Sequence, residues 1–260
     1  MSPSFTQLLH VARSGMLSRL QNLDTISNNL ANVNTVGFKR GRENFQEVLN
    51  ETLAAGAKTV GSGAGEMDNG VRIRASQNLM EQGSLRQTGN SLDLAIDGDG
   101  FFAIQLPDGR TGYTRDGQFF LDAERQLVTA DGFPLDWDGA IPEDATAIHI
   151  NPDGSVMARQ GDIWNQVGNI QISRFPNPSA LQIMDNNLWL ANEASGAAQT
   201  GAPLSEGFGQ LLSGVLENST VNLAEEMTNM VTTQRGYSLS VQTFQQADQM
   251  LYQAIHLRRG

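Results

Sequence analysis

The stretch LAEEMTNMVTTQRGYSLSVQTFQQADQMLYQAI, residues 223–255, decides the fold because it carries a long hydrophobic repeat close to the C-terminus. Alternate steps of four and three residues from its first leucine meet eight apolar side chains in ten positions, and no proline interrupts the run. A repeat of 3.5 residues is typical of helices that wind around a partner. This helix would be roughly 50 Å long, more than a small domain can cover, so we expect it to need a partner. The ten positions are Leu223, Met227, Met230, Gln234, Tyr237, Val241, Phe244, Asp248, Leu251 and Ile255.

The N-terminal segment supplies a candidate partner with the same period. Its apolar residues recur seven apart, and we expect the helix to stop near Asn34, because Asn and Gly in this region favour turns or left-handed backbone. Two interpretations are open: two ordinary helices packed on a globular core, or a coiled coil that joins the ends of one chain or of neighbouring chains. The repeat consists of Leu9, Met16, Leu23 and Leu30, followed three residues later by Ala12, Arg19, Ile26 and Val33, of which Arg19 alone breaks the pattern.

The bulk properties exclude several classes of protein. A chain of 260 residues can bury a core in one to three domains. Since it has no cysteine, neither disulfides nor a thiolate zinc site are expected. The first residues lack the basic and apolar regions of a signal peptide, so any export would use a route without a cleaved signal. No apolar run approaches the roughly 20 residues that a membrane span needs.

The net charge of −11 is concentrated in the middle of the chain. Residues 93–162 contain 14 Asp or Glu against four Arg, which gives a net charge of −10 for this region. A nucleic-acid-binding protein would need a basic stripe instead, so we expect no nucleic-acid partner.

Seven Asp-Gly pairs indicate that this middle region is built from turns. Short apolar or aromatic runs between and beyond them predict an antiparallel β domain. Residues 54–70 and 194–209 are rich in Gly, Ala or Ser and predict loops. The pairs begin at Asp97, Asp99, Asp108, Asp116, Asp131, Asp138 and Asp153, and the expected strands span residues 101–106, 118–121, 126–129, 147–150, 169–175 and 187–191.

Motifs that carry chemistry are largely absent from the sequence. His10, His149 and His256 lie far apart and have no ligand at metal-binding spacing, so we expect no metal site. Neither a nucleophile elbow nor a phosphate-binding loop occurs. Asp97-Gly-Asp-Gly lacks the acids that an EF-hand requires. A pair of carboxylates for glycoside cleavage is left open, but we expect no enzyme, no catalytic residue and no cofactor.

Three ordered segments resemble the bacterial flagellar axial proteins, which form the rod and hook. The first runs from Asn28 to Arg40 (NNLANVNTVGFKR) and the last from Asn222 to Tyr237 (NLAEEMTNMVTTQRGY). Between them, SLDLAIDGDGFF from Ser91 and YTRDGQF from Tyr113 are similar to the β segment of that family. The resemblance spans almost the whole chain, and Gly236 stands where the family usually has Ala.

The resemblance implies a structural subunit of the basal-body rod that assembles into a hollow helical tube, transmits torque and houses the export channel. Chain length, the Phe38-Lys-Arg sequence and the ending Asp248-Gln-Met-Leu are similar to the distal rod branch, whose extra stretch after the first helix would correspond to residues 51–70. A proximal rod or hook-basal-body protein is the alternative within the family. Outside it, the alternative is a non-flagellar self-associating surface protein with the same plan.

The expected fold class is α+β, in which the terminal helices pair as a coiled coil and flank a central antiparallel β domain. Residues 1–36 and 217–260 would form the inner-tube domain, and 91–193 the β domain. Residues 37–90 would be a linker region with the rod-type insertion, and 194–216 a return connection. Both termini are hypothesised to be largely disordered in the monomer and to fold on assembly.

The implied partners are further copies of the chain, other rod proteins and the hook protein, the flagellar export apparatus and surrounding ring proteins. The implied location is the basal body outside the cytoplasmic membrane, without embedding in it. Asn28, Asn29, Asn32 and Asn34 could cap the helix or bond across subunits, and Gln234 could set the register. The expected assembly interface comprises Leu9, Met16, Leu23, Leu30, Asn29, Asn32, Thr35, Gly37, Phe38, Leu223, Met227, Met230, Gln234, Arg235, Tyr237, Val241, Phe244 and Leu251.

Overall fold

The computed structural model describes residues 3–48, 70–184 and 187–257, and the chain divides into two compact units. The helical unit takes in residues 1–31, 41–77 and 222–260. The β unit takes in residues 32–40 and 78–221.

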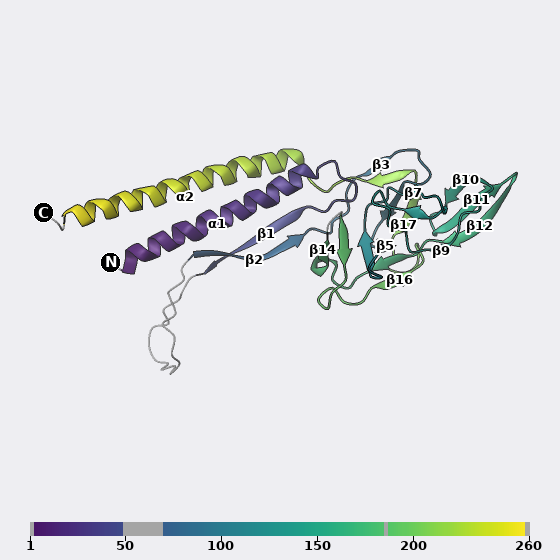
Figure 1. Ribbon diagram of the computed structural model, residues 1–260, viewed down its shortest axis with the longest axis horizontal. Helices are drawn as coiled ribbons and strands as arrows, with labels where there is room; N and C mark the ends of the chain where they lie inside the picture. The colour runs from purple at the N-terminus through teal and green to yellow at the C-terminus, as the bar shows by residue number, and fades with distance from the viewer. Residues whose placement is uncertain (1–2, 49–69, 185–186, 258–260) are drawn as a thin grey trace, which may run out of the picture. The chain divides into compact units, whose positions relative to one another are not determined.

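Two long helices dominate the helical unit. Helix α1 (Pro3–Ala31) and helix α2 (Leu223–Leu257) lie side by side (Figure 1), which confirms that both ends of the chain are helical. Strand β1 (Gly41–Val48) lies next to α1 and pairs with β2 (Gly70–Asn78). The region for which the sequence predicts a linker thus contributes a two-stranded sheet to this unit. The expected insertion at 51–70 lies outside the described residues, apart from its last residue, which begins β2.

Helix α2 begins where its capping chemistry requires. The Asn222 side-chain oxygen accepts the backbone N–H groups of Ala224 at 3.1 Å and Glu225 at 3.4 Å, which have no partner inside the helix. Glu225 and Glu226 in the first turn place negative charge at the positive end of the helix dipole. The start of the family-like segment at Asn222 is therefore a helix N-cap.

The β unit is built from sixteen short strands and one turn of 3-10 helix among its described residues. They are β3 (Leu85–Gln87), β4 (Leu94–Asp97), β5 (Phe101–Gln105), β6 (Thr111–Thr114), β7 (Phe120–Leu121), β8 (Leu127–Val128), β9 (Asp138–Gly139), β10 (Ala145–Ile150), β11 (Ser155–Gln160), β12 (Ile163–Asn169), β13 (Ile172–Arg174), η1 (Pro178–Ala180), β14 (Gln182–Met184), β15 (Leu188–Leu190), β16 (Gln199–Gly201), β17 (Gln210–Ser213) and β18 (Val215–Glu217).

These strands form antiparallel sheets, as the sequence predicts. The largest has the order β14-β15-β6-β5-β13-β16, and a second has the order β10-β11-β12-β9. Three two-stranded sheets, β17-β4, β18-β3 and β7-β8, complete the unit. Strands β16, β17 and β18 lie largely in residues 194–216, for which the sequence predicts only a return connection, so this stretch belongs to the β fold.

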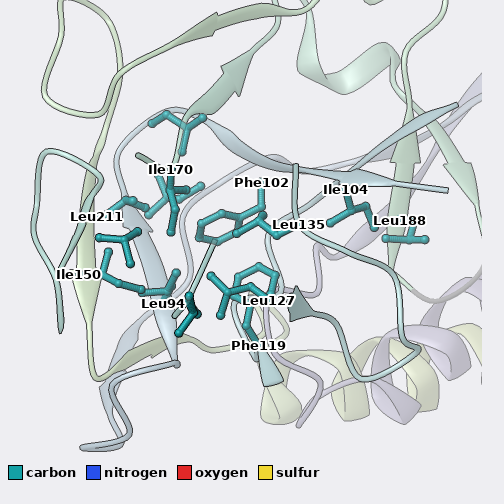
Figure 2. Close-up of a cluster of buried hydrophobic side chains, with 14 of the residues drawn as sticks. Leu94, Phe102, Ile104, Phe119, Leu127, Leu135, Ile150, Ile170, Leu188 and Leu211 are labelled. Carbon is teal, nitrogen blue, oxygen red and sulfur yellow. The ribbon is translucent and has the colours of Figure 1, made fainter. Parts of the chain in front are cut away.

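Strand β5 separates two apolar clusters because its side chains alternate between the faces of the sheet. Phe102 and Ile104 enter the main core (Figure 2), where Phe102 meets Phe119 edge to face with ring centroids 5.2 Å apart. Phe101 and Ala103 enter a second cluster on the other face. The main core comprises Leu94, Ile96, Phe102, Ile104, Leu106, Phe119, Leu127, Leu135, Ile141, Ile150, Val156, Ile170, Ile172, Leu188 and Leu211.

The Asp-Gly pairs serve two different purposes. In five of the seven the glycine has positive φ, as turn chemistry predicts; these are Gly98, Gly100, Gly109, Gly132 and Gly154. Gly117 instead lies against the backbone of Leu94, whose N–H donates to its carbonyl at 2.9 Å. A Cβ at position 117 would collide with the Leu94 carbonyl oxygen, so close packing rather than turn geometry requires this glycine.

Candidate assembly interface

Small and polar side chains take part in the contact between α1 and α2. The Asn22 side-chain amide donates to the Thr233 hydroxyl at 3.3 Å. Nearer the N-terminus, a Cβ at Gly15 would lie 3.9 Å from the Ser240 hydroxyl oxygen. The partner number falls as the residue number rises, as antiparallel helices require.

A heptad pattern marks the buried face of α2, but its residues are not the apolar ones. Glu226, Thr233 and Ala247 are buried and Ser240 is half-buried, each seven residues from the next. On α1 the buried residues are Ala12, Ser18, Ile26 and Asn29. Thr233, Ser240 and Ala247, which we call the small-residue row, permit close approach of the two helix backbones.

The apolar row for which the sequence predicts a seam is not the most buried face of α2, so a coiled coil within the single chain is not confirmed. Leu223, Met227 and Phe244 are 47%, 54% and 38% exposed. The row is centred roughly 80° around α2 from the buried heptad, at 100° per residue. It therefore borders the contact with α1 and leaves much of its apolar surface uncovered in the single chain.

The remaining members of the predicted interface divide into three groups. Met16, Leu23 and Leu30 on α1, and Met230, Tyr237 and Val241 on α2, are half-buried beside the helix contact. Gln234 and Arg235 are exposed. Leu9 and Leu251 lie within the two helices, but their side chains fall outside the described residues.

Asn29 joins the end of α1 to the following strand. Its side-chain amide donates to the Gly41 carbonyl at 2.9 Å, and its side-chain oxygen accepts the Gly41 N–H at 2.9 Å. Since Asn29 is buried with both polar atoms bonded within the chain, its role is to fix the path of β1 beside α1. The contact seen for Asn29 is thus intrachain, and its expected place in the assembly interface stays a prediction.

The turn after α1 has its own internal contacts. The Thr35 N–H and hydroxyl donate to the backbone and side-chain oxygens of Asn32, both at 3.1 Å. Gly37 follows with φ of +66°, and a Cβ there would lie 2.5 Å from the Arg115 carbonyl group. Gly37 is thus required by conformation and by packing. Phe38 is half-buried, and its carbonyl accepts the Thr220 N–H at 3.1 Å.

A buried charged cluster in the β unit was not foreseen from the sequence. The Glu217 carboxylate is fully buried and lies 2.5 Å from the Lys39 ammonium and 3.4 Å from the Arg115 guanidinium. Burial lowers the pKa of Lys39 and of Arg115, whereas the Glu217 carboxylate acts to raise both. The signal that could have found it is that Lys39 and Arg115 both stand inside the family-like segments.

Neither helix, in its described residues, carries an apolar segment long enough to cross a membrane.

Comparisons with known proteins match the chain at both terminal helices and in the β unit between them in sequence. Three family models match the chain in order: a flagella basal body rod protein model over residues 9–39, a flagellar hook protein FlgE/F/G D1 domain model over 95–158, and a flagellar basal body rod FlgEFG C-terminal model over 212–257. The first and last take in the facing portions of α1 and α2, and the middle one takes in β5 and β6.

Relatives that match this chain over most of their length are also flagellar proteins. The flagellar basal-body rod protein FlgG of Borreliella burgdorferi is 40% identical over 261 residues, covering 96% of this chain and 98% of the relative. FlgG of Caulobacter vibrioides is 40% identical over 260 residues, covering 97% and 99%. The flagellar hook-basal body complex protein FlhP of Bacillus subtilis is 32% identical over 256 residues, covering 89% and 91%. The chain therefore belongs to the flagellar basal-body rod and hook protein family, as a structural rod subunit that resembles the basal-body rod protein FlgG.

Proposed function

We propose that this rod subunit polymerises through the outer faces of α1 and α2 into a hollow tube that transmits torque and encloses the export channel. The observation that carries the proposal is the amount of large apolar surface that the helix pair leaves uncovered. Exposed large apolar side chains are Val11, Leu17 and Leu20 on α1 and Leu223, Met227, Val231, Leu239, Phe244, Met250 and Tyr252 on α2. An exposed apolar surface of this kind marks a protein-protein contact.

The exposed residues face more than one direction. Leu239 lies roughly 160° around α2 from Leu223, at 100° per residue. One neighbour could not cover both sides of the helix, so several copies must surround each α2. A contact in which one patch meets a different patch on the next copy continues without closing and produces a filament.

The coiled-coil character that the sequence predicts is, in this proposal, a property of the assembly. The apolar row of period 3.5 on α2 would meet helices of neighbouring copies. Within one chain the helices would stay in contact through their small-residue row. The terminal helices would then form the inner tube.

The distal rod is the position we propose within the flagellum, outside the cytoplasmic membrane and after export without a cleaved signal. The similarity to FlgG supports this position, whereas the weaker similarity to FlhP keeps the hook-basal-body alternative as the competing assignment. Partners would be further copies of the chain, adjacent rod proteins, the hook protein, the export apparatus and surrounding rings.

Electron microscopy of the purified protein and of isolated basal bodies tests the assembly surface. Phe244→Glu places a charge on the exposed apolar row of α2 and should abolish rods, because the charge would have to be buried between copies. Gln245→Glu is the matched control, since it adds the same charge at the next, exposed residue outside the row. Normal rods with Phe244→Glu, or equal loss with both variants, would contradict the proposal.

Labelling of a tagged subunit in isolated basal bodies tests the position. Label confined to the rod segment next to the hook is expected for a distal rod subunit. Label at the opposite end of the rod would favour the alternative, and no label on any basal body would reject a flagellar role.

A further inference from the structure

The charged cluster around Glu217 uses both oxygens of a fully buried carboxylate. Oε1 accepts from the Lys39 ammonium at 2.5 Å and from the Gly83 backbone N–H at 2.7 Å. Oε2 accepts from the Arg115 guanidinium at 3.4 Å. Hydrogen bonds between ionised groups are stronger than neutral ones, so this carboxylate is the centre of a strong local network.

The two cations extend the network to other strands of the β unit. The Lys39 ammonium also donates to the Glu81 carbonyl at 2.6 Å. The Arg115 guanidinium donates to the carbonyls of Ile96 at 3.3 Å and Gly98 at 2.8 Å. Each cation thus bonds both the carboxylate and a backbone segment that is distant from it in sequence.

The cluster lies where the chain leaves the β unit. The division into units means that the chain passes between them four times, after residues 31, 40, 77 and 221. The segments of the β unit next to these crossings are residues 32–40, 78–83 and 217–221. Lys39, Glu81, Gly83 and Glu217 come from all three segments, so the cluster bonds every segment that continues into the helical unit.

Backbone hydrogen bonds between the same segments surround the charged groups. The Gly37 N–H donates to the Glu217 carbonyl at 2.8 Å, and the Leu79 N–H donates to the Arg40 carbonyl at 2.9 Å. The Thr220 hydroxyl accepts the Arg40 N–H at 2.9 Å. The three segments therefore form one bonded bundle inside the β unit rather than three separate connections.

We infer that Glu217, together with Lys39 and Arg115, is a positioning residue that makes the connections to the helical unit resist force as one body. The inference rests on the proposed function, because a rod that transmits torque loads the chain between its units. Connections bonded only along their backbones would come apart strand by strand. A shared buried carboxylate requires all three segments to separate together, and separation would leave an uncompensated buried charge, which is strongly unfavourable.

Hydrogen exchange on the purified full-length protein tests the bundle without reference to the flagellum. Glu217→Gln keeps the size of the side chain and removes its charge. The amides of Gly37, Leu79 and Thr220 should all exchange at least about tenfold faster. Breaking a buried ion pair is strongly destabilising, and the loss of stability corresponds to more than about a tenfold increase in local opening. The amides of β5 and β6 should keep their rates.

Two further variants keep this test decisive. Lys39→Met removes one of the two cations that contact Glu217. It should raise the exchange rates of amides in the same three segments, even if Glu217→Gln folds poorly. Asp108→Asn removes an exposed ion pair with Arg110 in the same unit and should change none of them. Faster exchange in one segment alone, or equally faster exchange throughout the β unit, would overturn the inference.

Cells carrying Glu217→Gln test the mechanical role. Isolated basal bodies should contain rods of normal length, yet flagella should be lost several-fold more often than with Asp108→Asn when the cells swim in viscous medium. Equal loss at low and high viscosity would overturn the mechanical role. If Phe244→Glu also left rods intact, the proposed assembly would have failed, while the exchange result on the purified protein would still decide whether the bundle exists.

Discussion

The guanidinium group of Arg19 on α1 occupies the space that a Cβ at Gly236 on α2 would need, so these two residues are matched in size across the helix contact. Arg19 breaks the apolar repeat of the first helix, and Gly236 breaks the helix-forming character of the second. The structure explains both irregularities by a single contact.

Gly236→Ala should stabilise the protein by less than helix propensity alone predicts. Alanine is favoured over glycine inside a helix by about 1 kcal/mol, but here the arginine must move. In the Arg19→Ala background the full gain of about 1 kcal/mol should appear. Gly15→Ala is the control, because the nearest atom to its new Cβ is 3.9 Å away. Urea unfolding of the four-member cycle measures this, and equal gains in both backgrounds would disprove the size match.

Asp116 should make the β unit less stable as the pH rises. Burial raises the pKa of Asp116 from 3.8 to about 6, and the nearby Asp131 and Asp93 carboxylates add to this. The folded state therefore holds the proton more tightly than the unfolded chain, and stability falls between about pH 4 and pH 6. Asp116→Asn should be on the order of 1–3 kcal/mol more stable than the parent at pH 8 and close to it at pH 4.

Asp97→Asn provides the control of opposite sign for that pH profile. Hydrogen bonds from Gln210 and Gln82 lower the pKa of Asp97, so its contribution is present at neutral pH and is lost in acid. Removing the Asp97 carboxylate should weaken the protein at pH 7 more than at low pH. Thermal unfolding from about pH 2, below the ordinary pKa of Asp, to about pH 8 would separate the two cases. Parallel profiles for both variants would refute the assignment.

Two phenylalanines of the β unit should differ sharply in their importance for stability. Phe102 is fully buried against Phe119, whereas Phe120 is 51% exposed. Phe102→Ala should cost about 3–5 kcal/mol because it leaves a cavity in the main core, and Phe120→Ala should cost less than about 1 kcal/mol. Equilibrium unfolding in urea measures both. Similar costs would place the core elsewhere.

The dilute monomer should show uneven protection between its units. Amides in β5 and β6 are expected to exchange slowly, since both strands lie in the main sheet. Amides of α1 and α2 should exchange much faster, because their mutual contact buries mostly small side chains and their apolar rows lie open to water. Hydrogen exchange at low protein concentration tests this. Helices as protected as the β sheet would show that assembly is not needed to fold them.

Local patterns of the sequence predicted much of the fold. The repeats at the two ends identified the helices, and the expected stop near Asn34 lies close to the end of α1 at Ala31. Asp-Gly pairs located many of the turns because glycine conformation is decided by its neighbours in the chain. Each of the six expected strands overlaps an observed strand, since apolar runs between turns are a local signal as well.

Long-range pairings were beyond the reach of these patterns. Lys39 and Glu217 are 178 residues apart in sequence, and no local pattern around either residue predicts that they pair. Strand β12 was not predicted because most of its residues are exposed and show no apolar alternation. The part that Thr233, Ser240 and Ala247 take in the contact with α1 was not predicted. Small and polar residues give a weaker hydrophobic signal than the neighbouring row of Leu, Met and Phe.

That small-residue contact has a consequence for how such a tube could evolve. The spacing of α1 and α2 depends on the small volume of the side chains on their facing sides. It does not depend on which residues face outward. Outward residues could therefore be exchanged among related subunits without thickening or thinning the helix pair. A structure assembled from several diverged proteins would keep one wall thickness along its length while each junction acquired its own preferred neighbour.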